Sequence, residues 1–524
     1  MPRLLLIVVN LLLVSLLMAA PASAAGLTQP AAPQALARVA LPSGSDAVRT
    51  LAQAPLEVLA VETLPEAYAI VRAGPSGLDW LKANGYALAV LDGNAAGADY
   101  LMVDLAGAPA ERERPGVELY NDGLRAVRRL AAGQPVTLDK GAWLLNQPLH
   151  WADRQPLRRP ESVTPLPQVQ QIINQVTLGR LLPYANELSG EVPTTIMGEP
   201  YTIATRYTYS GEPVQQAVNY MVERLQRLGL NVTTHEWNAA YPHNIIAEKP
   251  GLDPNAGIVI LSAHLDNTSG SYMTLAPGAD DNGSGSVALL LAAEILSHYN
   301  FDATVRFILF TGEEQGLYGS KAYATMVQTQ DIRGVVNMDM IAWDSQGGPD
   351  MDVHSRSTVP GNTALANLFL DVVAAYQLPL TPVRYDNGSG ASDHASFWGK
   401  TIPAILVIEN YYSDPGIPAD FHAYYHTIND RVQHYNNGYY RAMAQASLAT
   451  LVHLAGLRTT CYWADLDCNG VVDLPDITQP AAAWQAQSGQ WNYSPVLDVD
   501  SSGAVNVLDI QRFAAAWGWA GNDG

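Results

Sequence analysis

Three apolar runs between Ile258 and Asp344 constrain the fold of this chain most, because acidic or imidazole side chains stand at the end of each run. The runs cover residues 258–266, 305–310 and 335–340. Apolar runs bounded by turn residues are typical of strands buried on both faces, as in a parallel sheet. In open α/β sheets the ligand site lies beyond the carboxyl ends of such strands. The polar residues that we expect to meet there are His264, Asp266, Glu313, Glu314 and Asp339.

Strands and helices alternate through this part of the chain, which predicts an α/β fold with a mostly parallel central sheet flanked by helices. Further strands are expected over residues 244–248 and 404–409. Helical patterns cover residues 168–188, 212–228, 285–298, 363–376 and 437–457. We assign this domain to residues 166–458.

The region before it, residues 25–165, predicts a small α+β unit in which we find no ligand constellation. Strands are expected over residues 56–61 and 86–91, with a helix over 77–84 between them. A pro-segment, an inhibitory prodomain and an accessory domain all fit this pattern. The Pro-bearing stretch 153–160 is the expected linker.

The first 24 residues predict a secretory signal peptide. Arg3 precedes an apolar run over residues 4–18, and Ala22-Ser23-Ala24 offers small residues for cleavage. The run is short for a membrane span, and no later stretch is long and apolar enough to cross a bilayer. We therefore expect an exported protein, secreted or associated with the cell surface, with no stable membrane span after cleavage.

The charge balance narrows the choice of partners. The 524 residues carry a formal net charge of -21, which argues against nucleic acid and anionic membranes as partners. A chain of this length has room for two to four domains, each with its own core.

A duplicated acidic loop occupies the C-terminal region, residues 461–520. Asp498 opens a copy of the loop that begins at Asp465, 33 positions earlier, and both copies have glycine at position 6. Oxygen side chains at positions 1, 3, 5, 9 and 12 with that glycine are the EF-hand pattern for Ca²⁺. The predicted calcium ligands are Asp465, Asp467, Asn469, Asp473 and Asp476 in the first loop and Asp498, Asp500, Ser502, Asn506 and Asp509 in the second.

Aspartate at position 12, with a helix after each loop and little helix before it, resembles type I dockerin modules. The resemblance implies a small helical calcium module and a cohesin-type scaffold or cell-surface protein as partner. Cys468 and Ser502 are unusual inside such loops, so calcium binding is better supported than cohesin binding. Cys461 and Cys468 are the two cysteines of the chain, and a local disulfide between them suits an oxidising compartment.

The acids and histidines of the main domain suit a metal site. His264 and Asp266 point the same way on a strand, so the carboxylate can hold a metal-binding imidazole in place. The acidic pair 280–281 lies on a glycine-flanked loop, where one carboxylate can bridge two ions. Of the glutamates 313–314, one can bind metal while the other acts on water. With His426 as a second imidazole, this mixed nitrogen and oxygen set suits zinc.

Six short motifs between residues 166 and 457 carry a resemblance to a known family. They are His264-Leu265-Asp266, Ala276-Pro277-Gly278-Ala279-Asp280-Asp281, Glu313-Glu314, Asn337-Met338-Asp339-Met340, Ser392-Asp393-His394-Ala395-Ser396-Phe397 and Tyr425-His426-Thr427. In this order and at this spacing they resemble the bacterial leucyl aminopeptidase-type zinc peptidases. That family has glutamate carboxypeptidase-like and glutaminyl cyclase-like relatives.

The resemblance implies a role for each residue. The implied zinc ligands are Asp281 as the bridge between two ions, His264 and Asp339 on one ion, and Glu314 and His426 on the other. Glu313 is implied to be the general base, and Asp266 to orient His264. Asp280 is the alternative bridge and His422 the alternative ligand. Asp393 and His394 are expected to support the site through hydrogen bonds.

The implied activity is removal of N-terminal residues from peptides with a free amino terminus, through water activated by two Zn²⁺ and Glu313. A glutaminyl cyclase or carboxypeptidase of the same fold is the alternative, as is an inactive binding protein anchored through the dockerin-like module. Met340, Trp343 and Phe397 are candidates for a side-chain pocket, against ordinary core packing. The stretch 385–391 lacks the cysteines that some relatives have there, which changes the loop that shapes the pocket.

Overall fold

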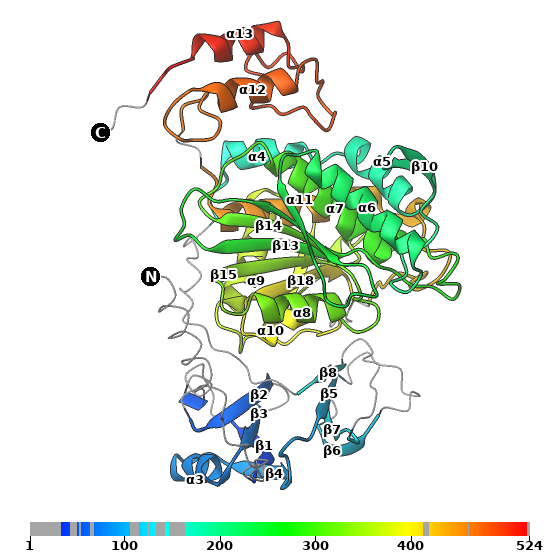
Figure 1. Ribbon diagram of the computed structural model, residues 1–524, viewed down its shortest axis with the longest axis vertical. Helices are drawn as coiled ribbons and strands as arrows, with labels where there is room; N and C mark the ends of the chain where they lie inside the picture. Colours follow the sequence, from blue (N-terminus) through cyan, green and yellow to red (C-terminus); the bar gives the residue numbers. More distant parts are fainter. Residues whose placement is uncertain are drawn as a thin grey trace, which may run out of the picture.

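The computed structural model describes residues 33–41, 50–51, 54–62, 68–104, 115–122, 125–132, 142–145, 163–411, 419–458 and 461–520. The predicted signal peptide and the predicted linker over 153–160 lie outside these residues. A large α/β domain forms the middle of the molecule, between a smaller β-rich part and a C-terminal pair of helices (Figure 1). In the part of the chain that the structure describes, no helix has the length and apolar character of a membrane span.

The α/β domain is built on an eight-stranded sheet with the order β11-β12-β14-β13-β15-β18-β16-β17. Its strands are β11 (Asn231–His235), β12 (Asn244–Lys249), β13 (Ile258–His264), β14 (Thr304–Phe310), β15 (Ile332–Met338), β16 (Asp350–His354), β17 (Thr381–Tyr385) and β18 (Ala404–Glu409). The pairs β14–β13, β13–β15, β15–β18 and β16–β17 are parallel, whereas β11–β12, β12–β14 and β16–β18 are antiparallel. The predicted mostly parallel sheet is confirmed.

Both faces of the sheet are buried, as the continuous apolar runs predict. Along β13, Val259 and Leu261 enter the main hydrophobic core, while Ile260 between them enters a second core on the other face. Among the described helices, those that pack into the main core are α4 (Pro167–Asn174), α5 (Leu178–Leu188), α6 (Glu212–Gln226), α7 (Gly285–Leu296), α9 (Asn362–Ala375) and α11 (Asn437–Ala455). The second core lies under α8 (Tyr318–Met326) and α10 (His394–Trp398).

The prediction of one helix over residues 168–188 is wrong, because the chain forms two helices there. Thr177, which directly precedes α5, has an extended backbone with φ −124° and ψ 153°. The two helices also pack on different neighbours, α4 against α11 and α5 against α7. The interruption therefore lets one apolar segment cover two parts of the core.

The N-terminal part contains two four-stranded sheets. The first, in the order β2-β3-β1-β4, is formed by β1 (Ala35–Ala40), β2 (Leu56–Glu62), β3 (Tyr68–Ala73) and β4 (Leu88–Asp92). Helix α3 (Pro75–Ala83) follows β3, close to the predicted helix. The second sheet, in the order β6-β7-β5-β8, is formed by β5 (Tyr100–Asp104), β6 (Val117–Asn121), β7 (Arg125–Arg129) and β8 (Ala142–Leu144).

The C-terminal module has near two-fold internal symmetry. Each loop leads into one helix, α12 (Leu474–Ala482) or α13 (Val507–Ala515). Val472 of the first loop pairs with Gly518 and Trp519, and its equivalent Val505 pairs with Gln485 and Ala486. The 33-residue repeat thus forms one interlocked unit.

This module also contacts the α/β domain. The Asn300 amide donates to the carbonyl oxygen of Leu466, and Val496 packs against the main core. Cys461 and Cys468 form the disulfide that their spacing suggests. The disulfide therefore ties the first acidic loop to the segment that precedes it, and the Asn300 hydrogen bond ties the loop to the α/β domain.

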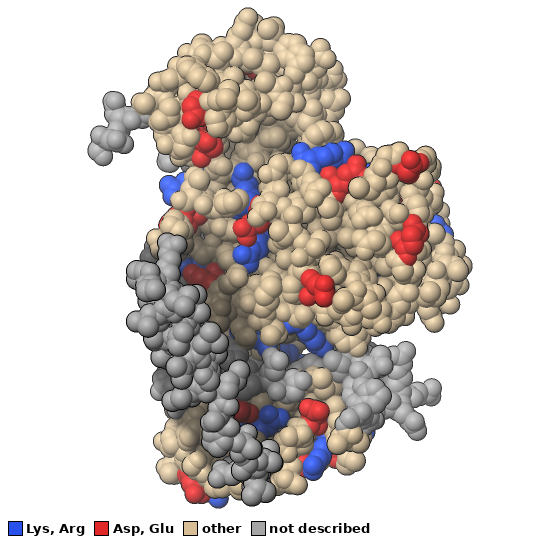
Figure 2. All heavy atoms as spheres, in the orientation of Figure 1, with Lys and Arg blue, Asp and Glu red and all other residues tan. Residues whose placement is uncertain are grey.

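Charged side chains are sparse on the face of the molecule shown in Figure 2. In Figure 2, acidic and basic residues form small groups separated by uncharged surface. This agrees with a charged fraction of only 15% in the whole chain.

Candidate metal centre and active site

The predicted zinc ligands meet beyond the carboxyl ends of the central strands. His264 is the last residue of β13, and Asp281 lies in the short π-helical turn η1 (Ala279–Ser284) that leads into α7. Glu314 follows β14, Asp339 follows β15, and His426 lies in the segment after β18. Because these strands are parallel neighbours, side chains far apart in the sequence reach one small volume.

The carboxylate of Asp281 lies between the two imidazoles. Its Oδ1 is 3.4 Å from Nε2 of His264, and its Oδ2 is 3.0 Å from Nε2 of His426. A second carboxylate approaches the same Nε2 atom of each imidazole. Oδ1 of Asp339 is 3.1 Å from His264 Nε2, and Oε2 of Glu314 is 3.1 Å from His426 Nε2.

These five side chains form two groups suited to metal ions. One comprises His264, Asp281 and Asp339, the other Asp281, Glu314 and His426, and within each group the candidate ligand atoms lie within 4.8 Å of one another. Each group offers an imidazole nitrogen and two carboxylate oxygens, the donors that Zn²⁺ takes at sites that keep a position for water. The residues present therefore fit two zinc ions that share Asp281.

The electrostatics of the metal-free centre favour a cation. Burial alone would lower the pKa of His264, but the charges of Asp339, Glu313 and Asp281 raise it well above its ordinary value. For His426, burial is likewise outweighed by Glu314 and Asp281, and the pKa rises to about 10. Without metal, each imidazole holds a proton among the carboxylates, and a divalent ion would replace that charge.

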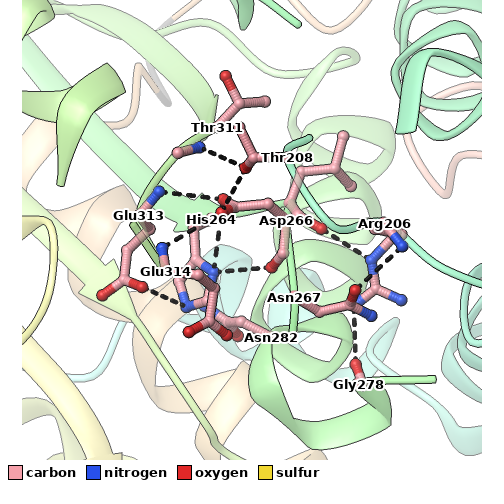
Figure 3. Close-up of polar contacts among 12 residues, drawn as sticks. Arg206, Thr208, His264, Asp266, Asn267, Gly278, Asn282, Thr311, Glu313 and Glu314 are labelled. Atoms are coloured by element: carbon pink, nitrogen blue, oxygen red, sulfur yellow. Dashed lines mark hydrogen bonds and ion pairs between the residues drawn. The ribbon is translucent and has the colours of Figure 1, made fainter. Parts of the chain in front are cut away.

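Glu313 belongs to neither of the two groups around Asp281, but with His264 and Glu314 it forms a third group of candidate ligand atoms within 4.8 Å of one another. It is fully buried, and its Oε2 lies 4.0 Å from Nε2 of His264. Its backbone N–H donates to Oδ1 of Asp266 at 3.2 Å, and the N–H of Glu314 donates to Oδ2 at 3.2 Å (Figure 3). A single carboxylate thus fixes the backbone from which both glutamates project.

Asp266 relates to His264 mainly through its backbone. Nδ1 of His264 is 3.0 Å from the Asp266 carbonyl oxygen and 3.9 Å from the nearer carboxylate oxygen. The carboxylate is engaged by the two glutamate amides and by the hydroxyl of Thr208, which donates to Oδ2 at 2.8 Å. The residue therefore joins the end of β13 to the loop after β14.

The loop that carries Asp281 is held by a buried carboxylate that the sequence motifs do not reveal. Oδ1 and Oδ2 of Asp430 accept from the backbone N–H groups of Asp280 and Asp281 at 2.8 and 3.0 Å. The side chain of Asp280 turns away to accept from the N–H of Ala342 at 2.9 Å, and it belongs to neither metal group. Asp280, the alternative bridging ligand, therefore stabilises the loop through this hydrogen bond.

Arg206 is a second supporting residue outside the motifs. It is fully buried, and its guanidinium donates to the backbone carbonyls of Leu188, Leu265, Pro277 and Gly278 at 2.7–2.9 Å. Burial lowers the pKa of Arg206 to about 10, although Asp430 and other acids oppose that shift. Asn267 accepts from the Arg206 N–H and donates to Ala276.

The remaining candidates lie around the centre. His422 belongs to neither metal group among the described residues; burial lowers its pKa, and its ring packs edge-on against Trp343 at 4.6 Å. Burial raises the pKa of Asp393 to about 7. Nε2 of His394 lies 2.8 Å from the carbonyl oxygen of Ser389.

The three pocket candidates have different surroundings. Met340, just after the end of β15, packs with Leu406 and Ile408 of β18, beside the partly buried Tyr411, Phe421 and Tyr425. Trp343 donates from Nε1 to Asp420 at 3.0 Å. Phe397 lies inside the second core, so core packing describes it fully.

The two acidic loops have matching local geometry. Asp465 accepts from the N–H groups of Asn469 and Gly470, and Asp498 accepts from those of Ser502 and Gly503. Each glycine at position 6 is left-handed, with φ 89° and 86°. The acids at positions 1, 3 and 12 form one group per loop, namely Asp465, Asp467 and Asp476, and Asp498, Asp500 and Asp509.

Comparison with known proteins now adds a family. Residues 244–451, which contain all five candidate zinc ligands and Glu313, match the model of peptidase family M28. The chain is similar to aminopeptidase Y of Saccharomyces cerevisiae, 35% identical over 31% of this chain and 29% of the yeast protein. It is also similar to leucine aminopeptidase 1 of Arthroderma gypseum, 34% identical over 39% of this chain and 56% of that protein. The chain therefore spans about a third to a half of these relatives.

The crystal structure of the LapA aminopeptidase of Legionella pneumophila is a more distant likeness. It is 18% identical, covers 81% of this chain and 99% of its own, and superposes with a TM-score of 0.48. The match to the M28 model is thus a likeness of residues 244–451.

Proposed function

We propose that this chain is a secreted metallo-aminopeptidase of the M28 type that removes the first residue from peptides with a free amino terminus. The observation that carries the proposal is the Asp281 carboxylate between the imidazoles of His264 and His426, with Asp339 and Glu314 beside them. The M28 match and the leucine aminopeptidase relatives support a peptidase over the other activities of this fold.

Two zinc ions, one per group with Asp281 shared, would polarise the scissile carbonyl and lower the pKa of the attacking water. The side chains that would hold them are His264 and Asp339 on one side, and Glu314 and His426 on the other.

Glu313 is the proposed general base. Its buried carboxylate lies next to the zinc groups, at 4.0 Å from His264 Nε2, so it can take a proton from water held there. The same carboxyl can then give the proton to the departing amine. The Asp266 carboxylate contributes by fixing the Glu313 and Glu314 amides, which sets the position of base and ligand together.

The apolar group around Met340 is the proposed pocket for the N-terminal side chain. It is formed by Met340, which directly follows Asp339 at the end of β15, and by Leu406 and Ile408 of the neighbouring strand β18. Its buried members Met340, Leu406 and Ile408 offer aliphatic surface, which suits leucine-like side chains.

The direct test is hydrolysis of a panel of aminoacyl anilides before and after chelation, with limited proteolysis as a second variable for the N-terminal region. Leucyl anilide should be cleaved, N-acetyl-leucyl anilide should not, and zinc should restore activity after chelation. Cyclisation of an N-terminal glutamine without peptide cleavage would instead show a glutaminyl cyclase, and cleavage from the carboxyl end a carboxypeptidase.

For the C-terminal module we propose two Ca²⁺ sites and docking to a cohesin-type scaffold or cell-surface protein. The support is the duplicated loop, with three acids gathered in each copy and a left-handed glycine at position 6. Calorimetric titration should give two calcium ions per chain, reduced to one in Asp465→Ala or Asp498→Ala. No binding to the unaltered chain would refute the proposal.

A further inference from the structure

A chain of six aromatic rings lies beside the metal centre, on the side away from the Met340 pocket. Ring centroids are 5.6 Å apart from Tyr318 to Trp237, 5.5 Å from Trp237 to Tyr241 and 4.6 Å from Tyr241 to Tyr209. The chain continues at 5.6 Å from Tyr209 to Tyr207 and ends 4.5 Å away at Tyr272. We call these six residues the aromatic strip.

The strip is attached to the backbone of the proposed catalytic residues. Thr208, between two of its tyrosines, donates to Asp266 at 2.8 Å and accepts from the N–H of Gly312 at 3.2 Å (Figure 3). Trp237 donates from Nε1 to the Thr311 hydroxyl at 2.8 Å. Residues 311–312 directly precede Glu313, so the rings and the base share one loop.

Gly312 shows how closely the ring and the loop fit. A Cβ at this position would lie 2.9 Å from the Trp237 ring and 3.3 Å from Cβ of Tyr318, and its φ is +74°. Trp237 itself stacks between Tyr241 and Tyr318 with interplanar angles of 22° and 20°. The inner half of the strip is therefore rigid, which limits the entropy that a bound ligand would lose.

The outer half of the strip is open to solvent. Tyr209 is 37% exposed and Tyr272 is 44% exposed, whereas side chains of this size usually pack away from water. Thr208, between Tyr207 and Tyr209 in the sequence, donates to the Asp266 carboxylate that also accepts from the N–H of Glu314, so this part of the strip lies next to the proposed zinc site. An open aromatic surface that begins at the metal centre is therefore in reach of substrate.

The sheet order sets the direction of a bound peptide. β13, with His264, lies between β14, whose end carries the loop under the strip, and β15 with β18, whose ends carry the Met340 pocket. A peptide with its scissile bond at the metal centre has one residue on its amino side and the rest of its chain on the other. A compact pocket suits the single residue, and an open strip suits the extending chain.

We propose that the aromatic strip binds the part of the peptide that follows the scissile bond and favours aromatic or large apolar residues there. This inference rests on the proposed aminopeptidase function and adds a substrate class to it. Aromatic side chains of the peptide would stack on Tyr209 and Tyr272, which offer exposed ring surface at the outer end.

The test compares kcat/KM for the tripeptides Leu-Phe-Phe and Leu-Gly-Gly. The unaltered protein should prefer Leu-Phe-Phe, and Tyr209→Ala should reduce the ratio of the two values about fivefold to tenfold, mainly through KM. Tyr209→Phe should keep the ratio. Trp484→Ala, which removes a ring 46% exposed in the C-terminal module, is the matched control and should change neither value.

If Tyr209→Ala folds poorly, Tyr272→Ala repeats the test. A purely structural defect would lower kcat/KM for both peptides equally and would leave their ratio unchanged. No preference for Leu-Phe-Phe, or an unchanged ratio in both alanine variants, would overturn the inference. Calorimetric binding of Leu-Phe-Phe to the Glu313→Gln variant separates the two proposals. Suppose that this variant binds Leu-Phe-Phe more tightly than Leu-Gly-Gly, while the unaltered protein hydrolyses neither peptide. That result would refute the proposed aminopeptidase activity and would still support peptide binding by the aromatic strip.

Discussion

The two kinds of metal site proposed for this chain are assembled in opposite ways. The proposed zinc ligands come from positions 264 to 426 and meet only because parallel strands end together. Each proposed calcium loop takes its ligands from twelve consecutive residues, and its acids are organised by N–H groups of the same loop. The first site depends on the whole domain, while the second depends on a local turn.

The difference has a chemical side as well. The zinc centre combines imidazoles with carboxylates and keeps the carboxylate of Glu313 beside them, which makes catalysis possible. The calcium loops offer oxygen atoms alone, the ligands of a hard cation that has a structural role. Five changes can break or sharpen this comparison.

The largest effect is expected at Glu313. Glu313→Gln should lower kcat on leucyl anilide by about 10² to 10⁴-fold, because a general base is lost, while bound zinc and calcium remain. Kinetics on this preparation check the loss of kcat, and metal analysis of the same preparation checks that zinc and calcium remain bound. Glu199→Gln, which changes an exposed carboxylate on β10 (Glu199–Tyr201), is the matched control. Unchanged kcat in Glu313→Gln would remove the base from the proposed mechanism.

Asp430 tests how far the zinc centre depends on its support. Asp430→Ala removes the acceptor of the Asp280 and Asp281 amides, so zinc affinity should fall about 10- to 100-fold. Calcium affinity should not change, since both loops lie outside this domain. Competition with a fluorescent zinc chelator measures the zinc affinity of both proteins. Equal affinities of Asp430→Ala and the unaltered chain would show that the loop with Asp281 keeps its conformation without Asp430.

Much of this arrangement could be predicted from the sequence, and the reason is physical. Strands buried on both faces leave continuous apolar runs, so the ends of β13, β14 and β15 could be placed, and their polar residues with them. The two acidic loops could be placed more easily still, because each lies within one repeat, while calcium binding there stays a prediction. β16 and β17 were not predicted, since segments such as Asp350–His354 mix acids with apolar residues.

The supporting residues could not be predicted for a related reason. Arg206 and Asp430 act on backbone groups 72 and 150 positions away, and such contacts leave no pattern in the sequence. The same holds for the aromatic strip, whose rings come from residues 207–209, 237–241, 272 and 318. A motif indicates candidate metal ligands, whereas only the fold shows which residues hold them in position.

The effect of pH should separate the two kinds of site. In the metal-free protein the raised pKa of His426, about 10, means that its charged contacts stabilise the fold at low pH and are lost as pH rises towards 10. Zinc needs the neutral imidazole, so the gain in Tm on adding zinc should grow from pH 6 to pH 9. The proposed calcium loops offer oxygen ligands and no imidazole, so the gain in Tm with calcium should change much less over this range. Equal pH profiles would contradict the separation.

The smallest effect is expected from the disulfide. Cys461→Ser should weaken calcium binding in the first loop less than tenfold, because the closed ring is short and the loop keeps its own hydrogen bonds. The second loop, with no disulfide, serves as the internal control in the same titration. Peptidase activity should be unaffected, and a fall in kcat would show coupling between the module and the α/β domain.

The central claim is that Asp281 joins two zinc ions in one centre, and zinc content measures it most directly. After loading with zinc and dialysis, the unaltered chain should retain two zinc ions. Asp281→Ala should lose both ions at a chelator concentration that leaves zinc bound to the unaltered chain. Its calcium content should not change. Retention of one tightly bound zinc in Asp281→Ala, or a single zinc in the unaltered chain, would contradict the account.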